Sequence, residues 1–413
     1  MGELLSVADA QKLVLDAFSP RETVTLPLSR AAERVLGEAV CSDQDLPAFD
    51  NSSMDGFAVL SEDVRQASHD HPVLLDVVTD IPAGQVVQVT LEGGQAARIM
   101  TGALMPAGAD AVVPVEETDH YGYESSAPLP KQVQIYKPVS AGGYVRPAGQ
   151  DVRSGEIVLE AGMRLRPQDI GLLAMLGKTG VMVHQKPRVA FFSSGDELLP
   201  LGAPLASGRV YDSNSYTLAA LLEKFGAEGI SLGIAQDQLK SVVATLDRGA
   251  DENVDLIISS AGVSVGAFDY VRAAVEKNGN IGFWRVNMRP GKPLTFGSYR
   301  GIPFIGLPGN PVSAFIGFEV FVRPVLNRLS GLAETEREYR LCYLTHDIES
   351  DGRESFLRAI LKFDDGKWTA RLTGHQGSGN LHSLVQANAL LLIPSGVKSL
   401  PVGALVKAWT LDS

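Results

Sequence analysis

The spacing of apolar residues near the N-terminus predicts one amphipathic helix. Ser6 and Asp9 are suited to cap it. Apolar residues recur every three or four positions after Ser6, as on one helical face that packs against a core. The residues expected on this face are Val7, Ala10, Leu13, Val14, Ala17 and Phe18.

The pattern changes between residues 46 and 167, where short apolar runs are broken by Gly, Pro and Asp. No long helical period separates these runs, which favours strands joined by turns. The sequence therefore predicts a β-rich region with strands in PVLLDVV, QVVQVTL, ADAVVPV and KQVQIY.

Strand and helix patterns alternate between about residues 186 and 330. The apolar segments KPRVAFFS, VDLIISS and GIPFIG are each followed by a glycine turn and a helical pattern. Such alternation is typical of βαβ units around a mostly parallel sheet covered on both faces. After residue 331 the chain returns to strand patterns, which predict a small all-β tail. The expected fold class is thus multidomain α/β plus β.

Composition narrows the class of protein. A chain of 413 residues is too long for a single compact core, so two to four domains are expected. The net charge of −12 and the lack of a Lys/Arg-rich run argue against a nucleic-acid or membrane-surface partner. Two cysteines form no disulfide framework, and neither a signal peptide nor an 18-residue apolar stretch is visible. A reduced, cytoplasmic setting is the expectation.

Three glycine-rich turns follow the apolar strands of the α/β region: SSGDE, SSAGVSVG and GLPGNP. Such turns gather at the carboxyl edge of a parallel sheet, where glycine and helix N-termini bring backbone N–H groups to phosphate. Tight βα loops also need glycine for structure alone. The absence of a Walker A motif and of GxGxxG disfavours a P-loop ATPase or a Rossmann dehydrogenase. The expected ligand-binding residues in these turns are Ser194, Gly195, Asp196, Gly262, Ser264, Gly266, Pro308, Gly309 and Asn310.

Carboxylates accompany the turns and suit Mg²⁺, which bridges substrate phosphates. Glu197, Asp212 and Asp269 are the expected metal ligands, although Asp196 or Glu197 could equally serve as a helix N-terminal charge. In FWRVNMRPGKP, an extended conformation of residues 283–289 would place Arg285 and Arg289 on one face, and Lys292 follows. Two guanidiniums on one face suit phosphate or another tetrahedral oxyanion, and a solvated strand edge is the alternative.

The β-rich region contributes polar residues in turns, Asp55, Thr101 and Asp151. Asp55 precedes Gly56, and Asp-Gly is also a hairpin signal without any function. The seven histidines show no metal-binding spacing, so a His-ligated zinc site is not expected.

Together these segments resemble the molybdopterin molybdenumtransferase (MoeA) family, which includes the E domain of gephyrin. The resemblance rests on PAFDNSSMDGFAV, RIMTGALMPAGADAVV, SSGDEL, VYDSNSY, AGVSVGAFDYV, FWRVNMRPGKP and GLPGNPVSA, which follow the family order over most of the chain.

The resemblance implies an elongated homodimer of four-part subunits. The parts are a discontinuous N-terminal segment (1–45 and 141–176), a β-rich domain (46–140), an α/β molybdopterin-binding domain (177–329) and a C-terminal β-barrel (330–413). It also implies an active site between the α/β domain of one subunit and the β-rich domain of the other.

The family reaction transfers molybdenum from molybdate to adenylylated molybdopterin and releases AMP. The catalytic residues that the resemblance implies are Asp55, Thr101, Asp151, Glu197, Asp212, Asp269, Arg285 and Arg289. Two features depart from the family pattern: Arg285 and Arg289 replace frequent lysines, and Ala267 stands where an acid is expected. Expected partners are the adenylyltransferase of the pathway and apo-molybdoenzymes.

Two alternatives remain open at this stage. The α/β domain also resembles the molybdopterin adenylyltransferases, although these typically lack the additional β domains. A non-catalytic scaffold of the gephyrin type is the other alternative, although the sequence shows no appended partner domain or long linker.

Overall fold

The computed structural model describes residues 4–122, 128–260, 270–333 and 337–411. The chain forms two compact units. The first contains residues 1–38, 161–170 and 179–413, and the second contains residues 39–160 and 171–178. Helix α2 (Pro167–Met175) and the three-residue helix η1 (Leu28–Arg30) complete the connecting segments. No helix in the described part of the chain is long and apolar enough to span a bilayer.

The first unit is built on a six-stranded sheet in the order β15-β12-β16-β20-β19-β17. The first four strands are parallel, whereas β19 and β17 are antiparallel to their neighbours. Every residue of β16 is buried, as the continuous apolar run predicts for a strand covered on both faces. The strands are β12 (Arg188–Ser194), β15 (Glu228–Ala235), β16 (Leu256–Ser260), β17 (Gly279–Arg285), β19 (Pro293–Tyr299) and β20 (Ile302–Leu307).

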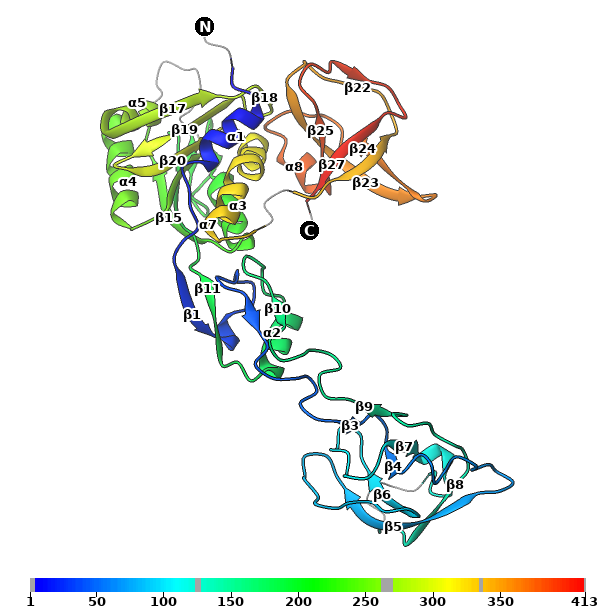
Figure 1. Ribbon diagram of the computed structural model, residues 1–413. Helices are drawn as coiled ribbons and strands as arrows, with labels where there is room; N and C mark the ends of the chain where they lie inside the picture. The colour runs from blue at the N-terminus through cyan, green and yellow to red at the C-terminus, as the bar shows by residue number, and fades with distance from the viewer. Residues whose placement is uncertain (1–3, 123–127, 261–269, 334–336, 412–413) are drawn as a thin grey trace. The chain divides into compact units, whose positions relative to one another are not determined.

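Helices cover both faces of this sheet (Figure 1). Helices α4 (Leu239–Asp251) and α5 (Tyr270–Asn278) bury their apolar sides in one core cluster. The opposite face carries a larger cluster with residues from the other helices. These are α1 (Val7–Leu15), α3 (Ser213–Lys224), α6 (Pro311–Gly317), the π-turn η3 (Phe318–Val322) and α7 (Arg323–Leu329).

Helix α1 confirms the predicted N-terminal helix. The Ser6 side chain caps it by accepting from the Asp9 backbone N–H at 3.1 Å. Val7, Ala10, Val14 and Phe18 are buried against the sheet. Leu13 and Ala17 are exposed, so the predicted apolar face was too wide. The helix ends at Leu15, and Ala17 therefore does not continue the helical period.

The C-terminal part of the first unit is a closed five-stranded β-barrel, as predicted. The ring runs β23-β24-β21-β27-β25 and closes by pairing β25 with β23. A short strand of the α/β part, β18 (Met288–Arg289), pairs in parallel with β23. The barrel elements are β21 (Arg340–Leu344), β22 (Ile348–Glu349), β23 (Glu354–Asp364), β24 (Lys367–Leu372), α8 (Leu381–Val385), β25 (Ala389–Ile393), β26 (Ser399–Leu400) and β27 (Leu405–Thr410).

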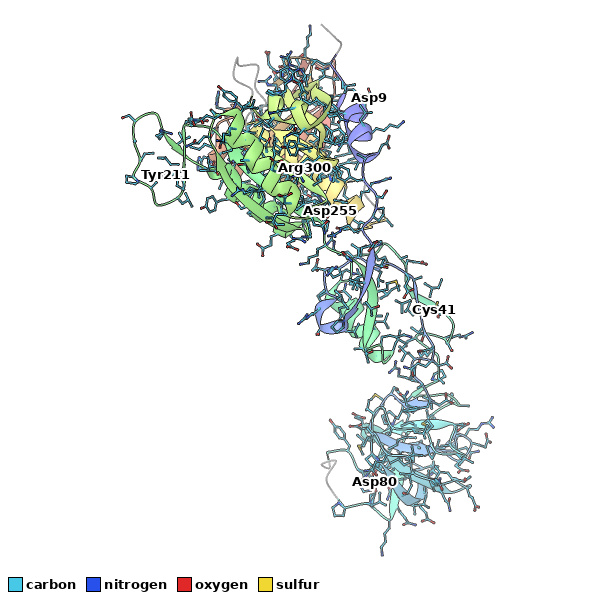
Figure 2. All side chains as sticks on the ribbon, turned by 90° about the vertical axis from the view of Figure 1, so that its left-hand side faces the viewer. Asp9, Cys41, Asp80, Tyr211, Asp255 and Arg300 are labelled. Carbon is cyan, nitrogen blue, oxygen red and sulfur yellow. The ribbon has the colours of Figure 1, made fainter. Side chains whose placement is uncertain are left out.

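Two short pairings in the first unit lie outside these sheets. Strand β1 (Thr23–Pro27) pairs antiparallel with β11 (Gly180–His184). Strands β13 (Leu198–Leu199) and β14 (Val210–Tyr211) form a loop structure that follows the first glycine turn, and Figure 2 shows Tyr211 on it, projecting from the α/β body.

The second unit is the expected β-rich region. Its five-stranded sheet has the order β7-β4-β6-β5-β8 and core clusters on both faces. The predicted strand in QVVQVTL is wrong: residues 85–89 have no strand pairing, and the Val86 side chain is exposed. Apolar alternation alone does not make a strand where no neighbouring edge is available. A helical turn, η2 (Val115–Glu117), follows β7. The strands are β2 (Val40–Cys41), β3 (Asn51–Ser52), β4 (Gly56–Val59), β5 (Val73–Ile81), β6 (Gln95–Ile99), β7 (Ala111–Pro114), β8 (Gln132–Ile135), β9 (Val145–Arg146) and β10 (Ile157–Leu159).

Candidate functional site

One asparagine side chain joins helix α3 to the carboxyl ends of two parallel strands. Asn214, in the first turn of α3, donates to the Ser260 hydroxyl at the end of β16 at 2.6 Å. The same amide donates to the Gly309 carbonyl in the turn after β20 at 2.8 Å. Asn214 belongs to the VYDSNSY segment that follows the first glycine turn. The predicted gathering of turns at the carboxyl edge is therefore confirmed for the described residues.

The first turn, Ser194–Glu197, is held from a neighbouring loop by Asp237. The Ser194 hydroxyl donates to one Asp237 oxygen at 3.0 Å, and the Asp196 N–H points to the other at 3.4 Å. In return, the Asp237 N–H donates to the Asp196 carboxylate at 3.1 Å. This reciprocal pair fixes the turn while leaving Asp196 exposed.

Glycine is required at position 195. Its φ is +154°, and a Cβ there would lie 2.6 Å from a Glu197 carboxylate oxygen. The Glu197 carboxylate therefore lies directly over the turn, and its side chain is exposed. Among the described residues, no hydrogen bond or ion pair engages the Glu197 carboxylate, so it remains available to a ligand.

Asp212 has a structural task as well. It is the N-cap of α3, and its side chain is almost fully buried. One carboxylate oxygen accepts both the Ser215 N–H at 3.1 Å and the Ser193 hydroxyl at 2.9 Å. This leaves the second oxygen for a ligand. Capping by Asp is worth about 1 kcal/mol.

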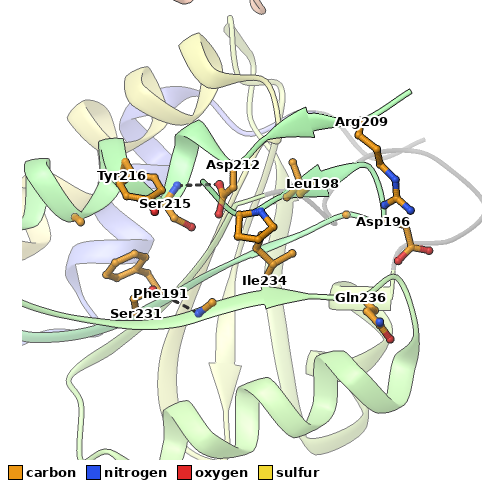
Figure 3. Close-up of a pocket in the computed structure, with 14 residues that line it drawn as sticks. Phe191, Asp196, Leu198, Arg209, Asp212, Ser215, Tyr216, Ser231, Ile234 and Gln236 are labelled. Atoms are coloured by element: carbon orange, nitrogen blue, oxygen red, sulfur yellow. Dashed lines mark hydrogen bonds between the residues drawn. The ribbon is translucent and has the colours of Figure 1, made fainter. Parts of the chain in front are cut away.

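A pocket of about 650 Å³ adjoins this turn, a volume that suits a small-molecule ligand (Figure 3). Gly195, Asp196 and Asp212 contribute its polar side, and the Arg209 side chain extends toward Asp196. Phe191 and Tyr216 are among the residues that give it an apolar wall. The pocket therefore combines an apolar surface with a few polar groups.

The segment 283–289 does not form the single extended strand that the sequence predicted. Strand β17 ends at Arg285, and the chain turns so that the Met288 N–H donates to the Val286 carbonyl at 2.9 Å. The Arg285 guanidinium lies over the Trp284 ring, 4.8 Å from its centroid. The shared face of Arg285 and Arg289 is therefore a wrong prediction, because the turn breaks the alternation on which it depended.

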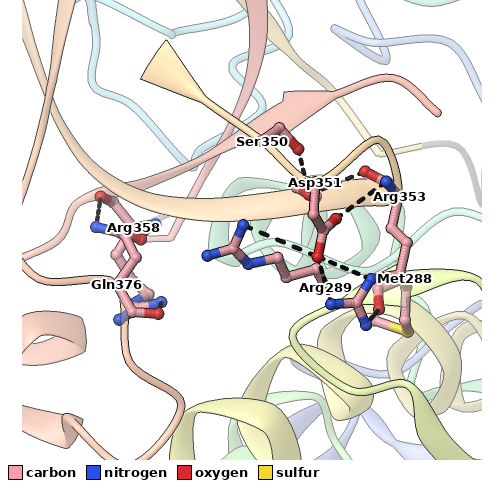
Figure 4. A network of polar contacts seen from close by, with 8 residues as sticks. Met288, Arg289, Ser350, Asp351, Arg353, Arg358 and Gln376 are labelled. Carbon is pink, nitrogen blue, oxygen red and sulfur yellow. Dashed lines mark hydrogen bonds and ion pairs between the residues drawn. The ribbon is translucent and has the colours of Figure 1, made fainter. Parts of the chain in front are cut away.

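Arg289 instead faces the barrel. Its guanidinium lies 3.9 Å from Asp351, and Figure 4 shows it between Asp351 and Arg358 in this view. The Arg353 guanidinium donates twice to one Asp351 oxygen, and the Arg353 backbone N–H donates to the other at 3.1 Å. These bonds lower the pKa of the Asp351 carboxyl, with a smaller effect from Arg289. Lys292 is exposed and has no ion pair among the described residues.

Arg358 is fully buried and has only neutral hydrogen-bond partners in the described chain. It donates to the Ser383 hydroxyl at 3.0 Å and to the carbonyls of Gln376 at 3.1 Å and Gly377 at 3.0 Å. Burial, with a further effect from the Arg289 charge, lowers the pKa of Arg358 to about 10. Of the two guanidiniums, only Arg289 lies near a carboxylate, Asp351, which Arg353 already engages. The pair therefore favours an anion.

Loop 374–380, which Arg358 holds, also meets the third glycine turn. The Ser378 carbonyl accepts the Val312 N–H at 3.1 Å in the first turn of α6. Asn310 is the N-cap of that helix, but its side chain makes no capping hydrogen bond. Gly309 and Asn310 are exposed, whereas Pro308 is buried. The Arg358 loop and the predicted anion-binding turn are therefore neighbours in the fold.

In the second unit, two predicted residues come together. The Thr101 N–H and hydroxyl both donate to one Asp55 oxygen, at 2.7 and 2.8 Å. Asp151 forms an ion pair with Arg146 at 2.5 Å, and both side chains are about half exposed. Asp55 thus has a defined partner, beyond its place in an Asp-Gly turn.

Family comparison decides the identity of the chain. Residues 5–177 match the model of the MoeA N-terminal region (domain I and II), and residues 190–328 match a probable molybdopterin binding domain. Residues 342–411 match the MoeA C-terminal region (domain IV). The chain belongs to the MoeA family.

Relatives agree over the full length of this MoeA-family chain. Molybdopterin molybdenumtransferase 2 of Mycobacterium tuberculosis (strain H37Rv) is 40% identical, over 98% of this chain and 99% of its own. Molybdopterin molybdenumtransferase of Nostoc sp. is also 40% identical, over 95% of this chain and 90% of its own. The crystal structure of the molybdopterin biosynthesis MoeA protein from Pyrococcus horikoshii OT3 superposes with a TM-score of 0.81 at 31% identity, covering 99% and 100% of the two chains.

Several predicted site residues of the MoeA-family chain cannot be assigned a geometry. Gly262, Ser264, Gly266 and Asp269, together with Ala267, lie outside the described residues. Among the residues that are described, no three His, Cys, Asp or Glu side chains converge in a group that could hold a metal ion. The donors still fit Mg²⁺, which commonly uses one or two carboxylates with substrate phosphates and water.

Three residues of the site were missed by the sequence reasoning. Asp237 lies in a loop without a motif, and Asn214 stood inside a quoted motif without being singled out. Arg358 had one available signal, a charged residue at the centre of the apolar strand FLRAILKF. A buried charge in such a run points to a specific set of partners.

Proposed function

We propose that this MoeA-family protein transfers molybdenum from molybdate to adenylylated molybdopterin and releases AMP. In this reaction, water cleaves the phosphoanhydride between the pterin phosphate and AMP. The two dithiol sulfurs bond to molybdenum, and one molybdate oxygen leaves as water with the two thiol protons. The observation that carries the proposal is the adjacency of the Arg289–Arg358 pair, the third glycine turn and the carboxylate-bearing first turn in one fold.

Full-length similarity to proteins named molybdopterin molybdenumtransferase supports this transferase over the adenylyltransferase and scaffold alternatives. The chain carries the N-terminal and C-terminal MoeA regions as well as the α/β part. An adenylyltransferase that consists of the α/β domain alone would have no use for either region.

The phosphates are proposed to bind at the acidic edge, which is the carboxyl edge of the parallel sheet with Glu197 and Asp212. Glu197, Asp212 and Asp269 would hold Mg²⁺, which neutralises charge on the pyrophosphate when bound. Asn214 and Asp237 act as positioning residues, because they hold the turns from which the ligand contacts come. The backbone of Ser194, Gly195, Gly309 and Asn310 would contact phosphate oxygens.

Molybdate is proposed to bind at the basic side of the site, which is formed by Arg289, Lys292 and Arg358. Arg289 and Lys292 would contact the oxyanion together with Arg358, which the sequence reasoning had not included. Fixed guanidinium forks orient a tetrahedral dianion before the reaction, and positioning with charge neutralisation provides most of the catalysis. Arg285 is a weaker candidate for this role, since its guanidinium stacks on Trp284.

A homodimer completes the proposal. Asp55, Thr101 and Asp151 of a second copy would contribute the remaining polar contacts to the pterin. We also propose a cytoplasmic location, with the pathway's adenylyltransferase as the source of the substrate and apo-molybdoenzymes as recipients of the product.

The test is AMP release from adenylylated molybdopterin by the purified protein, with and without molybdate and Mg²⁺. Molybdate-dependent release, with a product that activates an apo-molybdoenzyme, supports the transferase. ATP consumption in the presence of metal-free molybdopterin would instead identify an adenylyltransferase. Tight substrate binding without any release would identify a binding or scaffold protein.

A further inference from the structure

A second polar groove lies at the opposite edge of the parallel sheet. Strand β12 begins at Arg188, β15 begins at Glu228, and Asn253 precedes β16, so the groove borders the amino ends of the strands. Its volume is about 390 Å³. The candidate active site uses the carboxyl ends of the same strands, and the two sites share no lining residue.

The groove is basic, in contrast to the chain as a whole. Arg21, Arg34, Lys186 and Arg188 line it, with Glu228 as the one carboxylate among the lining residues. Asp255 adds a second carboxylate nearby, at 3.3 Å from Arg21. Four cations therefore face two carboxylates in a protein whose net charge is −12. A local excess of positive charge in a concave surface attracts anions.

Two of the arginines are fixed in place by the backbone. Arg21 donates to the Lys186 carbonyl and Arg34 donates to the His184 carbonyl. Burial lowers the pKa of Arg34, as is expected for a guanidinium without a carboxylate partner. These contacts use only part of each guanidinium, so the remaining N–H groups have a fixed direction.

Hydrogen-bond donors in the groove remain unused. The Arg188 Nε is buried and has no hydrogen-bond partner, although Arg188 Nη2 lies 3.5 Å from Glu228. The Lys186 ammonium is exposed and has no partner in the described chain. A buried N–H without an acceptor is unfavourable because it has lost its hydrogen bond to water, and an anionic oxygen would restore that bond.

We propose that this groove binds a phosphate-type tetrahedral dianion, as inorganic phosphate or as the phosphate group of a small phosphorylated molecule. The guanidinium forks and the ammonium match its oxygens, and the volume leaves room for a small attached group. Arg21 and Arg34 come from the N-terminal segment, whereas Lys186 and Arg188 lead into β12. The bound anion therefore links these two segments and stabilises the folded chain.

Calorimetric titration of the full-length protein with inorganic phosphate tests the proposal. Lys186→Ala should weaken phosphate binding by roughly tenfold or more, and Lys186→Glu should abolish it. Lys240→Ala is the matched control and should bind as the unmodified protein does, because Lys240 is an exposed lysine of α4 with no ion pair to any described residue. Thermal unfolding without phosphate verifies that each variant is folded.

A second variant separates the groove from the candidate active site. Phosphate binding should persist in Arg289→Gln, and AMP release should be unchanged in Lys186→Ala. Loss of all phosphate binding in Arg289→Gln, with normal binding in Lys186→Glu, would overturn the proposal because the affinity would belong to the other site. Failure of the AMP-release assay alone would leave the groove intact and count only against the proposed function.

Titration with molybdate, another tetrahedral dianion, tests the selectivity of the groove for phosphate. Competition of molybdate with phosphate for the Lys186-dependent site supports a general tetrahedral oxyanion site. Binding of molybdate there without any binding of phosphate would overturn the phosphate assignment and make the groove an additional site for the metal substrate.

Discussion

The candidate site has two regions of opposite charge. The α/β edge carries the carboxylates of Asp212, Asp237 and Glu197, and the barrel side carries the guanidiniums of Arg353 and Arg358. On the α/β edge, Asp212 and Asp237 accept hydrogen bonds that shape the turns, while Glu197 remains exposed. On the barrel side, Arg353 is neutralised by Asp351, while Arg358 is buried with neutral partners only. Each side therefore contains charged groups whose hydrogen bonds or ion pairs are made within the fold, and one group whose charge is left for a ligand. The acidic α/β edge therefore suits phosphate with its bound metal ion, and the basic barrel side suits an oxyanion without a metal ion.

The largest expected effect concerns the buried guanidinium. Arg358→Met leaves the Gln376 and Gly377 carbonyls and the Ser383 hydroxyl without their donor, so the free energy of unfolding should fall by about 3 kcal/mol. Arg353→Met is the control on the same side and should cost less than about 1 kcal/mol, since both side chains of its ion pair are about a third exposed. Urea denaturation measures both. Equal losses would contradict the distinction between the two arginines.

The next effect concerns the free carboxylate of the α/β edge. Glu197→Ala should lower the rate of AMP release by about a hundredfold, because charge neutralisation at the phosphates is lost. Stability should stay within about 0.5 kcal/mol, since the side chain is exposed. The control is Glu223→Ala, an exposed glutamate of α3. Normal turnover by Glu197→Ala would remove the central element of the metal-site proposal.

Asp212 allows the structural and functional parts of one residue to be separated. Asp212→Ala should lower the free energy of unfolding by about 1 kcal/mol through loss of the cap. Asp212→Asn keeps an acceptor for Ser215 and Ser193 and should retain that stability. A large loss of AMP release in Asp212→Asn alone would show that the charge is used by the ligand, whereas normal activity would limit Asp212 to capping.

The smallest expected effect is a pH dependence of the free energy of unfolding that comes from the Arg353–Asp351 ion pair. Arg353 holds the pKa of Asp351 below its ordinary value. The stabilisation is complete above the unfolded pKa of about 3.9 and is lost as pH falls through the lower folded pKa. It should amount to less than about 1 kcal/mol, because both side chains are partly exposed. Unfolding midpoints of the unmodified protein and Arg353→Met should therefore differ at pH 6, and the difference should shrink as the pH falls below about 3.9.

The sequence was informative wherever the evidence was local. Apolar runs located the strands of the parallel sheet and the barrel, and the glycine turns located its ligand edge. Prediction from the sequence failed where the local structure depends on contacts with other segments of the chain. Residues 85–89 alternate like a strand but have no edge to pair with, and the turn at Val286 separates Arg285 from Arg289. Asp237 could not be found because its importance comes from a contact 43 residues away in the chain, with Ser194.

The pairing of β18 with β23 has a consequence for the order in which the molecule is completed. Within four residues, the chain meets the N-terminal segment through Leu5 and Val286, and the barrel through Arg289 and Ser355. The first of these contacts involves residues that precede the barrel in the chain, whereas the second requires Ser355 of β23. Glu197 and Asp212 of the acidic edge likewise precede the barrel, whereas the proposed molybdate site also needs Arg358 of β23. A chain that ended before the barrel would therefore contain Arg289 and Lys292 but lack Arg358, the third proposed contact to molybdate.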